Sequence, residues 1–283
     1  MQLLTAHAGN WTGAGTGVTV ILPPPGTVGS GEVRGGAPAT REFDLLHPLR
    51  TVDRVDAVVL SGGSAFGLAA ADGVMTVLRE RGLGFPTPYG PVPIVVGMSI
   101  FDESVATTPP DAESGRRAAL AALAGDPLAL GRAGAGAGAS TGRWRGRADP
   151  GGLGRADGRA GPARVTALAV VNAWGDVLTP AGEPVFGGDE TYRPAAPFGR
   201  ENTTIAVVLT DAALGKADCH LLAQSGHGGF ARALHPAHSR YDGDAVVALA
   251  SGEVTDGVDL DLLRAVTTEV MASAIRRAAG THP

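Results

Sequence analysis

The sequence of 283 residues has one cysteine, no excess of basic charge and no long apolar run. A single cysteine, Cys219, excludes an internal disulfide and suits a reducing cytoplasm, so we expect Cys219 to be a buried small side chain. The formal net charge of −5, without a basic stripe, argues against a nucleic-acid partner. Because no apolar run reaches the roughly 18 residues of a membrane span and the N-terminus does not resemble a signal peptide, we expect no membrane association.

The composition that remains is that of a globular protein. Hydrophobic residues make up 44% of a chain long enough to enclose a substantial core. The 43 glycines weaken the evidence of any single glycine motif. Metal sites need compact ligand spacing, so we expect no metal from the four histidines His220, His227, His235 and His238, whose spacing is not compact.

Short apolar runs alternate with helical segments along the chain, which favours an α/β fold. Residues 131–140 are expected to be a flexible connector, 147–163 an exposed mobile loop, and 180–202 a long linker. The predicted strands are 17–22, 56–60, 93–97, 165–171, 203–209 and 245–249. The predicted helices are 65–81, 112–124, 211–234 with a pause at 226–229, and 259–278. Periodicity alone predicts nothing finer than this class.

A strand, a glycine turn and a helix meet at Ser61-Gly62-Gly63-Ser64. Such a turn often binds anions, but the lysine of a phosphate loop and the spacing of a dinucleotide fingerprint are both missing. We therefore expect no nucleotide cofactor. The backbone N–H groups of Gly62 and Gly63 remain candidates for binding an oxyanion or a substrate.

A polar turn enters an apolar strand at Asn202-Thr203-Thr204. In one interpretation the two threonines simply begin the strand, since threonine favours strands. In the other, the chain cuts its own Asn202–Thr203 bond, and Thr203 becomes an N-terminal nucleophile whose α-amine is the base.

Motifs over nearly the whole chain decide between these interpretations, because together they resemble one family. They are Val33-Arg-Gly-Gly-Ala-Pro38, Asp56 to Leu68 around Ser-Gly-Gly-Ser-Ala-Phe-Gly, Gly142-Arg143-Trp144, Val170-Val-Asn-Ala-Trp-Gly-Asp176, Asn202-Thr-Thr-Ile-Ala-Val-Val208 and Asp242-Gly-Asp244. The chain resembles the L-aminopeptidase/D-amidase-esterases, β-aminopeptidases and endo-type nylon-oligomer hydrolases.

The resemblance implies a four-layer αββα sandwich, in which two central sheets are flanked by helices. It also implies one autoprocessed domain, 1–283, cleaved into a larger subunit 1–202 and a smaller subunit 203–283. The two subunits would stay associated, in a homotetramer of cleaved protomers. Neither a cofactor nor a metal is implied.

The resemblance also assigns roles to individual residues. Thr203 matches the nucleophile, Asn202 the residue left at the new C-terminus, and Asn172 the asparagine that contacts the reacting carbonyl. The acidic pair Asp242 and Asp244 would orient Thr203 or Thr204 and attract a substrate ammonium group.

At two positions the chain departs from the family pattern. Arg143 aligns with the lysine of the Gly-Lys-Trp motif in the nylon-hydrolase branch. An arginine stabilises negative charge but is a poor proton shuttle. Phe101 aligns with a tyrosine of many members and so lacks its hydroxyl. We expect Phe101 and Thr204, together with the glycine turn, to line the substrate site.

The function that the resemblance implies is hydrolysis of amino-terminated amides through an acyl-enzyme. Candidate substrates are 6-aminohexanoate oligomers, β-peptides and small aminoacyl amides. Two alternatives stay open: an acyltransferase of the amino-acid acetyltransferase type, and an uncleaved, non-catalytic binding protein.

Overall fold

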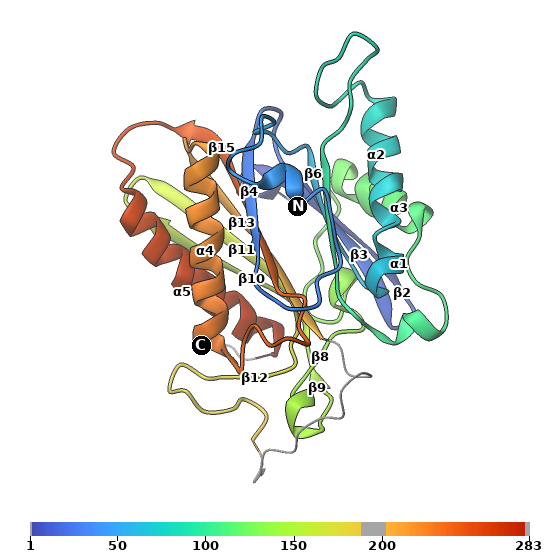
Figure 1. Cartoon of the computed structure of the whole chain (residues 1–283), viewed down its shortest axis with the longest axis vertical. Helices are drawn as coiled ribbons and strands as arrows, with labels where there is room; N and C mark the ends of the chain where they lie inside the picture. The colour runs from blue at the N-terminus through green and yellow to red at the C-terminus, as the bar shows by residue number, and fades with distance from the viewer. Residues whose placement is uncertain (1, 188–201, 281–283) are drawn as a thin grey trace.

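The computed structural model describes residues 2–187 and 202–280. Two sheets lie face to face, and each is covered on its outer side by helices (Figure 1). The strand orders are β1-β2-β3-β6-β7-β5 in the first sheet and β10-β11-β13-β15-β4 in the second. The predicted four-layer α/β sandwich is therefore confirmed.

The first sheet is built mainly from the N-terminal part of the chain and is covered by α2 and α3. Only β6 and β7 run parallel to each other. The strands are β1 (Gln2–Leu3), β2 (Ala6–Gly13), β3 (Thr16–Leu22), β5 (Thr40–Arg41), β6 (Ala57–Ser61) and β7 (Val95–Ser99). The helices are α1 (Ser64–Gly67), α2 (Ala70–Glu80) and α3 (Ala112–Ala124).

The second sheet contains the strand that begins at Thr203, directly after the predicted cleavage position. Its strands are β4 (Val28–Val33), β10 (Gly152–Ala160), β11 (Ala163–Asn172), β13 (Thr203–Ala212) and β15 (Ala245–Val254). Parallel strands need a crossover, and α4 (Lys216–Ala233) supplies it between β13 and β15. With α5 (Leu260–Ala278), α4 covers the outer face of this sheet.

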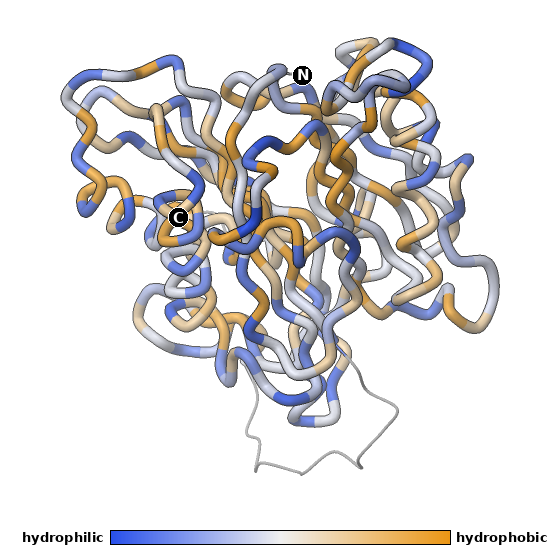
Figure 2. Tube along the Cα trace, turned by 45° about the horizontal axis from the view of Figure 1, so that its top comes forward, coloured by the Kyte–Doolittle hydropathy of each residue, from blue (hydrophilic) through white to orange (hydrophobic). Residues whose placement is uncertain are grey.

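The core lies in three apolar layers. Because successive side chains of a strand point to opposite faces, β13 contributes side chains to two of these layers. Ile205, Val207 and Leu209 pack between the sheets, whereas Ala206 and Val208 face α4 and α5. Figure 2 shows hydrophobic segments concentrated in the interior strands. None of the described helices combines the length and apolar character that a membrane span requires.

Two segments predicted to be irregular are ordered parts of the sandwich. Most of 147–163 forms β9 (Asp149–Pro150) and β10, which pairs with β11 along its whole length and forms the edge of the second sheet. The predicted mobile loop is therefore wrong. In 131–140, the short helix η3 (Gly134–Gly136) is buried, so this run packs into the fold instead of forming a flexible connector.

The prediction of a helix from 211 is also wrong at its start. Asp211 lies inside β13 and accepts hydrogen bonds from the Arg164 backbone and side chain, both at 2.7 Å. The helix begins at Lys216 and continues without a pause through the predicted glycine break at 226–229. Cys219 is buried, as expected. Most of the predicted linker 180–202 lies outside the described residues.

Candidate active site

Thr203 is the first residue of β13 and lies between β11 and β15. Its partner across the antiparallel ladder is Asn172, the last residue of β11. Thr203 is 4% exposed and Asn172 1%, so both candidate side chains lie inside the protein at one end of the second sheet. The sequence separates these residues widely, and strand register brings them together.

The Asn202–Thr203 peptide bond is held from several sides. Thr203 Oγ lies 2.5 Å from the Asn202 carbonyl oxygen and donates to it. The Gly243 N–H donates to the same oxygen at 3.1 Å, while the Asn202 N–H donates to the Tyr241 carbonyl at 3.3 Å. Hydroxyl and backbone donor thus converge on one carbonyl oxygen, which places Thr203 Oγ beside the carbonyl group that it would attack.

Gly243 also gives the Thr203 hydroxyl its space. A Cβ atom at position 243 would lie 2.8 Å from Thr203 Oγ and 2.7 Å from the Ala37 carbonyl oxygen. The sequence motif named this glycine only as the middle of Asp-Gly-Asp. Both of its contacts, to the hydroxyl and to the Asn202 oxygen, come from distant parts of the chain.

Ser140 joins the two candidate asparagines, although no motif in the sequence distinguishes it. Its backbone N–H donates to Asn172 Oδ1 at 2.9 Å, and its carbonyl accepts from Asn202 Nδ2 at 3.4 Å. The Asn172 Nδ2 group donates to the Phe101 carbonyl at 2.9 Å. The Asn172 amide is therefore fixed by backbone groups on both sides.

Arg143 approaches the same cluster from a short turn, η4 (Arg143–Arg145). Its guanidinium donates to Ser140 Oγ at 3.1 and 3.2 Å. The turn is attached to the end of β11 by the Trp144 N–H, which donates to the Trp174 carbonyl at 2.9 Å. Within residues 2–187 and 202–280, no ion pair joins Arg143 to a carboxylate.

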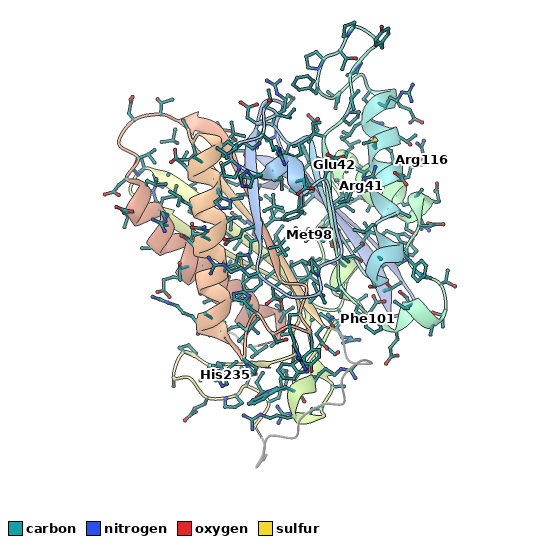
Figure 3. The ribbon with its side chains drawn as sticks, viewed as in Figure 1. Arg41, Glu42, Met98, Phe101, Arg116 and His235 are labelled. Carbon is teal, nitrogen blue, oxygen red and sulfur yellow. The ribbon has the colours of Figure 1, made fainter. Side chains whose placement is uncertain are left out.

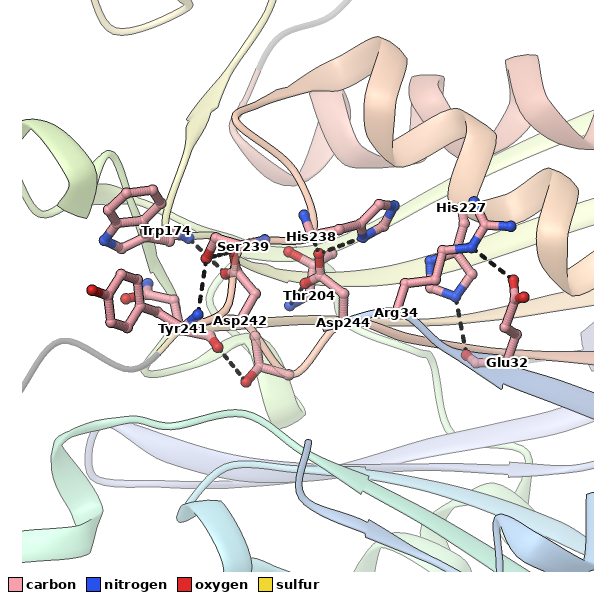
Figure 4. A network of polar contacts seen from close by, with 12 residues as sticks. Glu32, Arg34, Trp174, Thr204, His227, His238, Ser239, Tyr241, Asp242 and Asp244 are labelled. Atoms are coloured by element: carbon pink, nitrogen blue, oxygen red, sulfur yellow. Dashed lines mark hydrogen bonds and ion pairs between the residues drawn. The ribbon is translucent and has the colours of Figure 1, made fainter. Parts of the chain in front are cut away.

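Asp242 is buried and holds the loop before β15 (Figure 4). Its Oδ1 accepts from the Trp174 N–H at 3.1 Å, and its Oδ2 accepts from the Ser239 N–H at 3.2 Å and hydroxyl at 2.6 Å. Burial, reinforced by the neighbouring Asp244 carboxylate, raises the pKa of Asp242 to about 7.

Asp244 binds the start of β13 directly. Its Oδ1 accepts from the Thr204 N–H at 2.8 Å, and its Oδ2 accepts from the backbone and the ring of His238 at 3.0 and 2.9 Å. Every oxygen of the acidic pair thus has a protein donor. This geometry favours the expected orienting role over direct binding of a substrate ammonium group.

The remaining candidate substrate residues have mixed outcomes. The N–H groups of Gly62, Gly63 and Ser64 donate to the Gly17 carbonyl, the Asp102 carboxylate and the Ile100 carbonyl at 2.9, 3.1 and 2.8 Å. These donors serve the fold, so the structure lends no support to an oxyanion site at this turn. Among the described residues, the Thr204 hydroxyl is buried without a polar partner, and its role at the substrate site stays a prediction.

Phe101 lies at the end of the sandwich that holds the site, and its carbonyl anchors Asn172 (Figure 3). Three other aromatic rings gather just after the end of β11: the Trp174 ring centroid lies 5.4 Å from that of Tyr241 and 6.4 Å from that of Trp144. In the part of the chain that the structure describes, no cluster of three or more His, Cys, Asp or Glu side chains could hold a metal.

The sequence matches a family model and several curated proteins. The model for peptidase family S58 matches residues 3–281. An uncharacterized aminopeptidase of Mycobacterium tuberculosis is 43% identical over 276 residues, which cover 89% of this chain and 78% of that protein. A 6-aminohexanoate-oligomer endohydrolase of Agromyces sp. is 31% identical over 296 residues, covering 93% and 80%.

Solved structures share the architecture at lower identity. The β-aminopeptidase of Burkholderia sp. has a TM-score of 0.73 at 22% identity, over 98% of this chain and 84% of that chain. An L-aminopeptidase D-Ala-esterase/amidase from Ochrobactrum anthropi, described as a new variant among the Ntn hydrolase fold, has a TM-score of 0.71 at 19% identity over 96% and 82%. At these identities the similarity concerns the fold.

Proposed function

The chain belongs to peptidase family S58, and we propose that it cuts its own Asn202–Thr203 bond and then hydrolyses amides with Thr203 as an N-terminal nucleophile. Hydrolysis of the aminopeptidase/amidase kind follows from the family and its named relatives. The nucleophile and the self-cleavage are our proposal. The observation that carries them is the 2.5 Å contact between Thr203 Oγ and the Asn202 carbonyl oxygen.

Self-cleavage would begin with attack of Thr203 Oγ on the Asn202 carbonyl carbon. The new C–O bond replaces the C–N bond, and the released nitrogen takes up the hydroxyl proton, which leaves an ester between Asn202 and Thr203. Water then hydrolyses the ester to the Asn202 carboxylate and a free Thr203 hydroxyl. The Gly243 N–H already donates to the oxygen on which negative charge would develop.

In turnover, the new α-amine of Thr203 would act as the general base. An unperturbed α-amine has a pKa of about 7.7–8.0, so a useful fraction is unprotonated at neutral pH. It accepts the hydroxyl proton as Thr203 attacks the substrate amide, and the leaving amine departs with that proton. Water resolves the acyl-enzyme.

Asn172 and Arg143 would stabilise the negative charge of the reaction. One hydrogen of Asn172 Nδ2 is donated to the Phe101 carbonyl, and the second is the proposed oxyanion donor. Such a donor is typically worth about 3–4 kcal/mol in the transition state. An arginine is a poor proton shuttle, so the role of Arg143 would be electrostatic.

The proposed substrates are amides of amino-terminated acyl chains, such as 6-aminohexanoate oligomers, β-peptides or small aminoacyl amides. The named relatives support this class. Because the oxygens of Asp242 and Asp244 already accept from protein donors, the pair would favour a substrate ammonium group through its negative potential near Thr203, without a direct contact.

We further propose that the products of cleavage, 1–202 and 203–283, remain together in a homotetramer in the cytoplasm. In the second sheet, β13 and β15 of the smaller product lie between β11 and β4 of the larger product. This arrangement supports lasting association of the products.

The self-cleavage proposal is tested by intact mass and N-terminal sequencing of the purified protein. We expect two fragments, the smaller beginning Thr-Thr-Ile-Ala. Thr203→Ala should give one uncleaved, inactive species, whereas the control Ser251→Ala, which removes a buried hydroxyl without a polar partner, should cleave normally. A single 283-residue species from the unchanged sequence would instead favour the non-catalytic alternative.

The substrate proposal is tested on matched amides whose amino group is free or acetylated, at low and high salt. We expect faster hydrolysis of the free amines, with a preference that salt weakens if the site is open to solvent. Equal rates within each pair would remove the acidic pair from substrate recognition. Transfer of the acyl group to an added amine in preference to water would favour the acyltransferase alternative.

A further inference from the structure

His238 lies in the loop that leads into β15, with its ring inserted between Asp244 and helix α4 (Figure 4). The ring stacks on Phe230 at a centroid distance of 5.7 Å and meets the His227 ring edge-on at 4.9 Å. The backbone of His238 has a φ of +56°, a conformation in which asparagine is the most favoured residue after glycine. Packing and backbone together fix the direction of the imidazole.

The imidazole of His238 donates a hydrogen bond to one oxygen of Asp244, Oδ2. Nδ1 lies 2.9 Å from Oδ2, and the backbone N–H of His238 donates to the same oxygen at 3.0 Å. Because a carboxylate accepts, Nδ1 carries the hydrogen of this bond. Asp244 is 1% exposed, so the protein must supply the donors that water cannot.

The neighbouring ring of His227 adds no charge to this arrangement. Burial lowers the pKa of His227 to about 3, and its Nε2 donates to the Glu32 carbonyl at 3.0 Å. Of these two histidines, His238 is therefore the one that holds the Asp244 carboxylate.

The other oxygen of Asp244 replaces a strand partner. Pairing of β13 with β15 begins at Ile205 and Ala245, so the Thr204 N–H has no backbone acceptor on that side and donates to Asp244 Oδ1 at 2.8 Å. The peptide that follows Thr203 is thus held by a carboxylate, and this carboxylate is held by His238.

We propose that His238 is a positioning residue: through Asp244 it fixes the Thr204 amide and thereby the nucleophile Thr203. The inference rests on the proposed function for its catalytic consequence. His238 contacts neither Thr203 nor the Asn202 carbonyl, so it acts only through the carboxylate.

Three substitutions separate the donor from the bulk of the ring. In His238→Asn the amide branches at Cγ, as the imidazole does, so Nδ2 can reach the Nδ1 position. His238→Gln carries its amide one bond further out, and His238→Leu has no donor. His220→Gln is the matched control, since the His220 ring contacts the Gly31 carbonyl at 3.2 Å and not Asp244.

Two readouts are measured on the full chain: hydrogen exchange of the Thr204 amide, and the rates of self-cleavage and turnover. We expect His238→Gln and His238→Leu to speed exchange of the Thr204 amide. They should also lower kcat by about 10- to 100-fold with little change in KM, because each loses one hydrogen bond to a charged group. His238→Asn should restore both within about threefold, and His220→Gln should match the unchanged protein.

Unchanged Thr204 exchange in His238→Gln, or an equal loss in His238→Asn, would overturn the inference. If His238→Leu does not fold, the Asn and Gln pair still decides. If the unchanged protein neither cleaves itself nor hydrolyses amides, the proposed function fails, whereas Thr204 exchange still tests the role of His238.

Discussion

Gly243 would influence the attack of Thr203 on the Asn202 carbonyl in two ways, through its N–H group and through its lack of a side chain. The glycine N–H holds the Asn202 oxygen, and the missing side chain leaves room for the Thr203 hydroxyl. A methyl group here would meet two oxygen atoms at 2.7 and 2.8 Å, of which only the hydroxyl can move.

We therefore predict that Gly243→Ala slows self-cleavage by about tenfold or more, because the hydroxyl is pushed from the carbonyl it must attack. The time course of fragment formation, followed by intact mass, measures this effect. Gly215→Ala is the control, since its nearest contact to an added Cβ atom is at 3.7 Å. Equal cleavage rates in the two variants would refute the steric argument.

The raised pKa of Asp242 has a consequence for stability. Its ordinary value is 3.8 and its folded value about 7, so between these values the folded protein binds a proton that the unfolded chain releases. The contribution of this group to stability is present below about pH 4 and is lost as the pH rises toward 7.

Asp242→Asn should remove this part of the pH dependence. We expect its melting temperature to fall less than that of the unchanged protein between pH 4 and 7, although the variant loses one hydrogen bond from Ser239. Parallel melting curves for the two proteins across this range would show that Asp242 is ionised throughout.

Among the elements, α4 is anchored at its beginning by the only lysine of the chain, Lys216. Its ammonium group donates to the carbonyls of Leu45, Arg50 and Val52 at 2.8, 3.0 and 2.6 Å. The helix that joins β13 to β15 is thereby attached to the loop that follows β5, far away in sequence.

Lys216→Met keeps most of the side-chain volume but removes the three bonds. We predict a loss of about 1.5–3 kcal/mol in the free energy of unfolding, measured by urea titration, since hydrogen bonds to a charged group are worth this much. Self-cleavage should persist, because the contacts lie away from Thr203. A change below about 0.5 kcal/mol would mean that water replaces the ammonium group without cost.

For the molecule as a whole, cleavage at Asn202 would cut the chain without dividing the fold. The second fragment would carry β13, β15, α4 and α5, and the first would carry β4, β10 and β11 of the same sheet. A separated fragment would expose the apolar layer between the sheets to water.

We therefore predict that both fragments stay in one particle under native mass spectrometry and separate only on denaturation. When residues 203–283 are produced alone, they should be insoluble or unfolded. Soluble, independently folded fragments would contradict the shared core.

Local sequence determined the elements whose information lies within a few residues. After its two threonines, the run 203–209 is continuously apolar, as in a strand buried on both faces. Asp259 caps the last helix by accepting from the N–H groups of Asp261 and Leu262. The strand and cap signals depend only on neighbouring residues, so they can be recognised without knowledge of the rest of the fold. The motif around Asn202 and Thr203, by contrast, predicts a cleavage position only together with the motifs in the rest of the chain.

Only the tertiary structure decided the parts that depend on distant partners. The β10 segment contains glycine and charged residues, a composition typical of a loop, yet its pairing with β11 makes it an edge strand. Gly154 allows α5 to pack closely, because a Cβ atom at this position would clash with the Ala274 carbonyl oxygen. Ser140 and His238 became part of the site in the same way. Their partners lie far apart in the chain or depend on a turn, and no pattern of neighbours can encode which carboxylate or amide they meet.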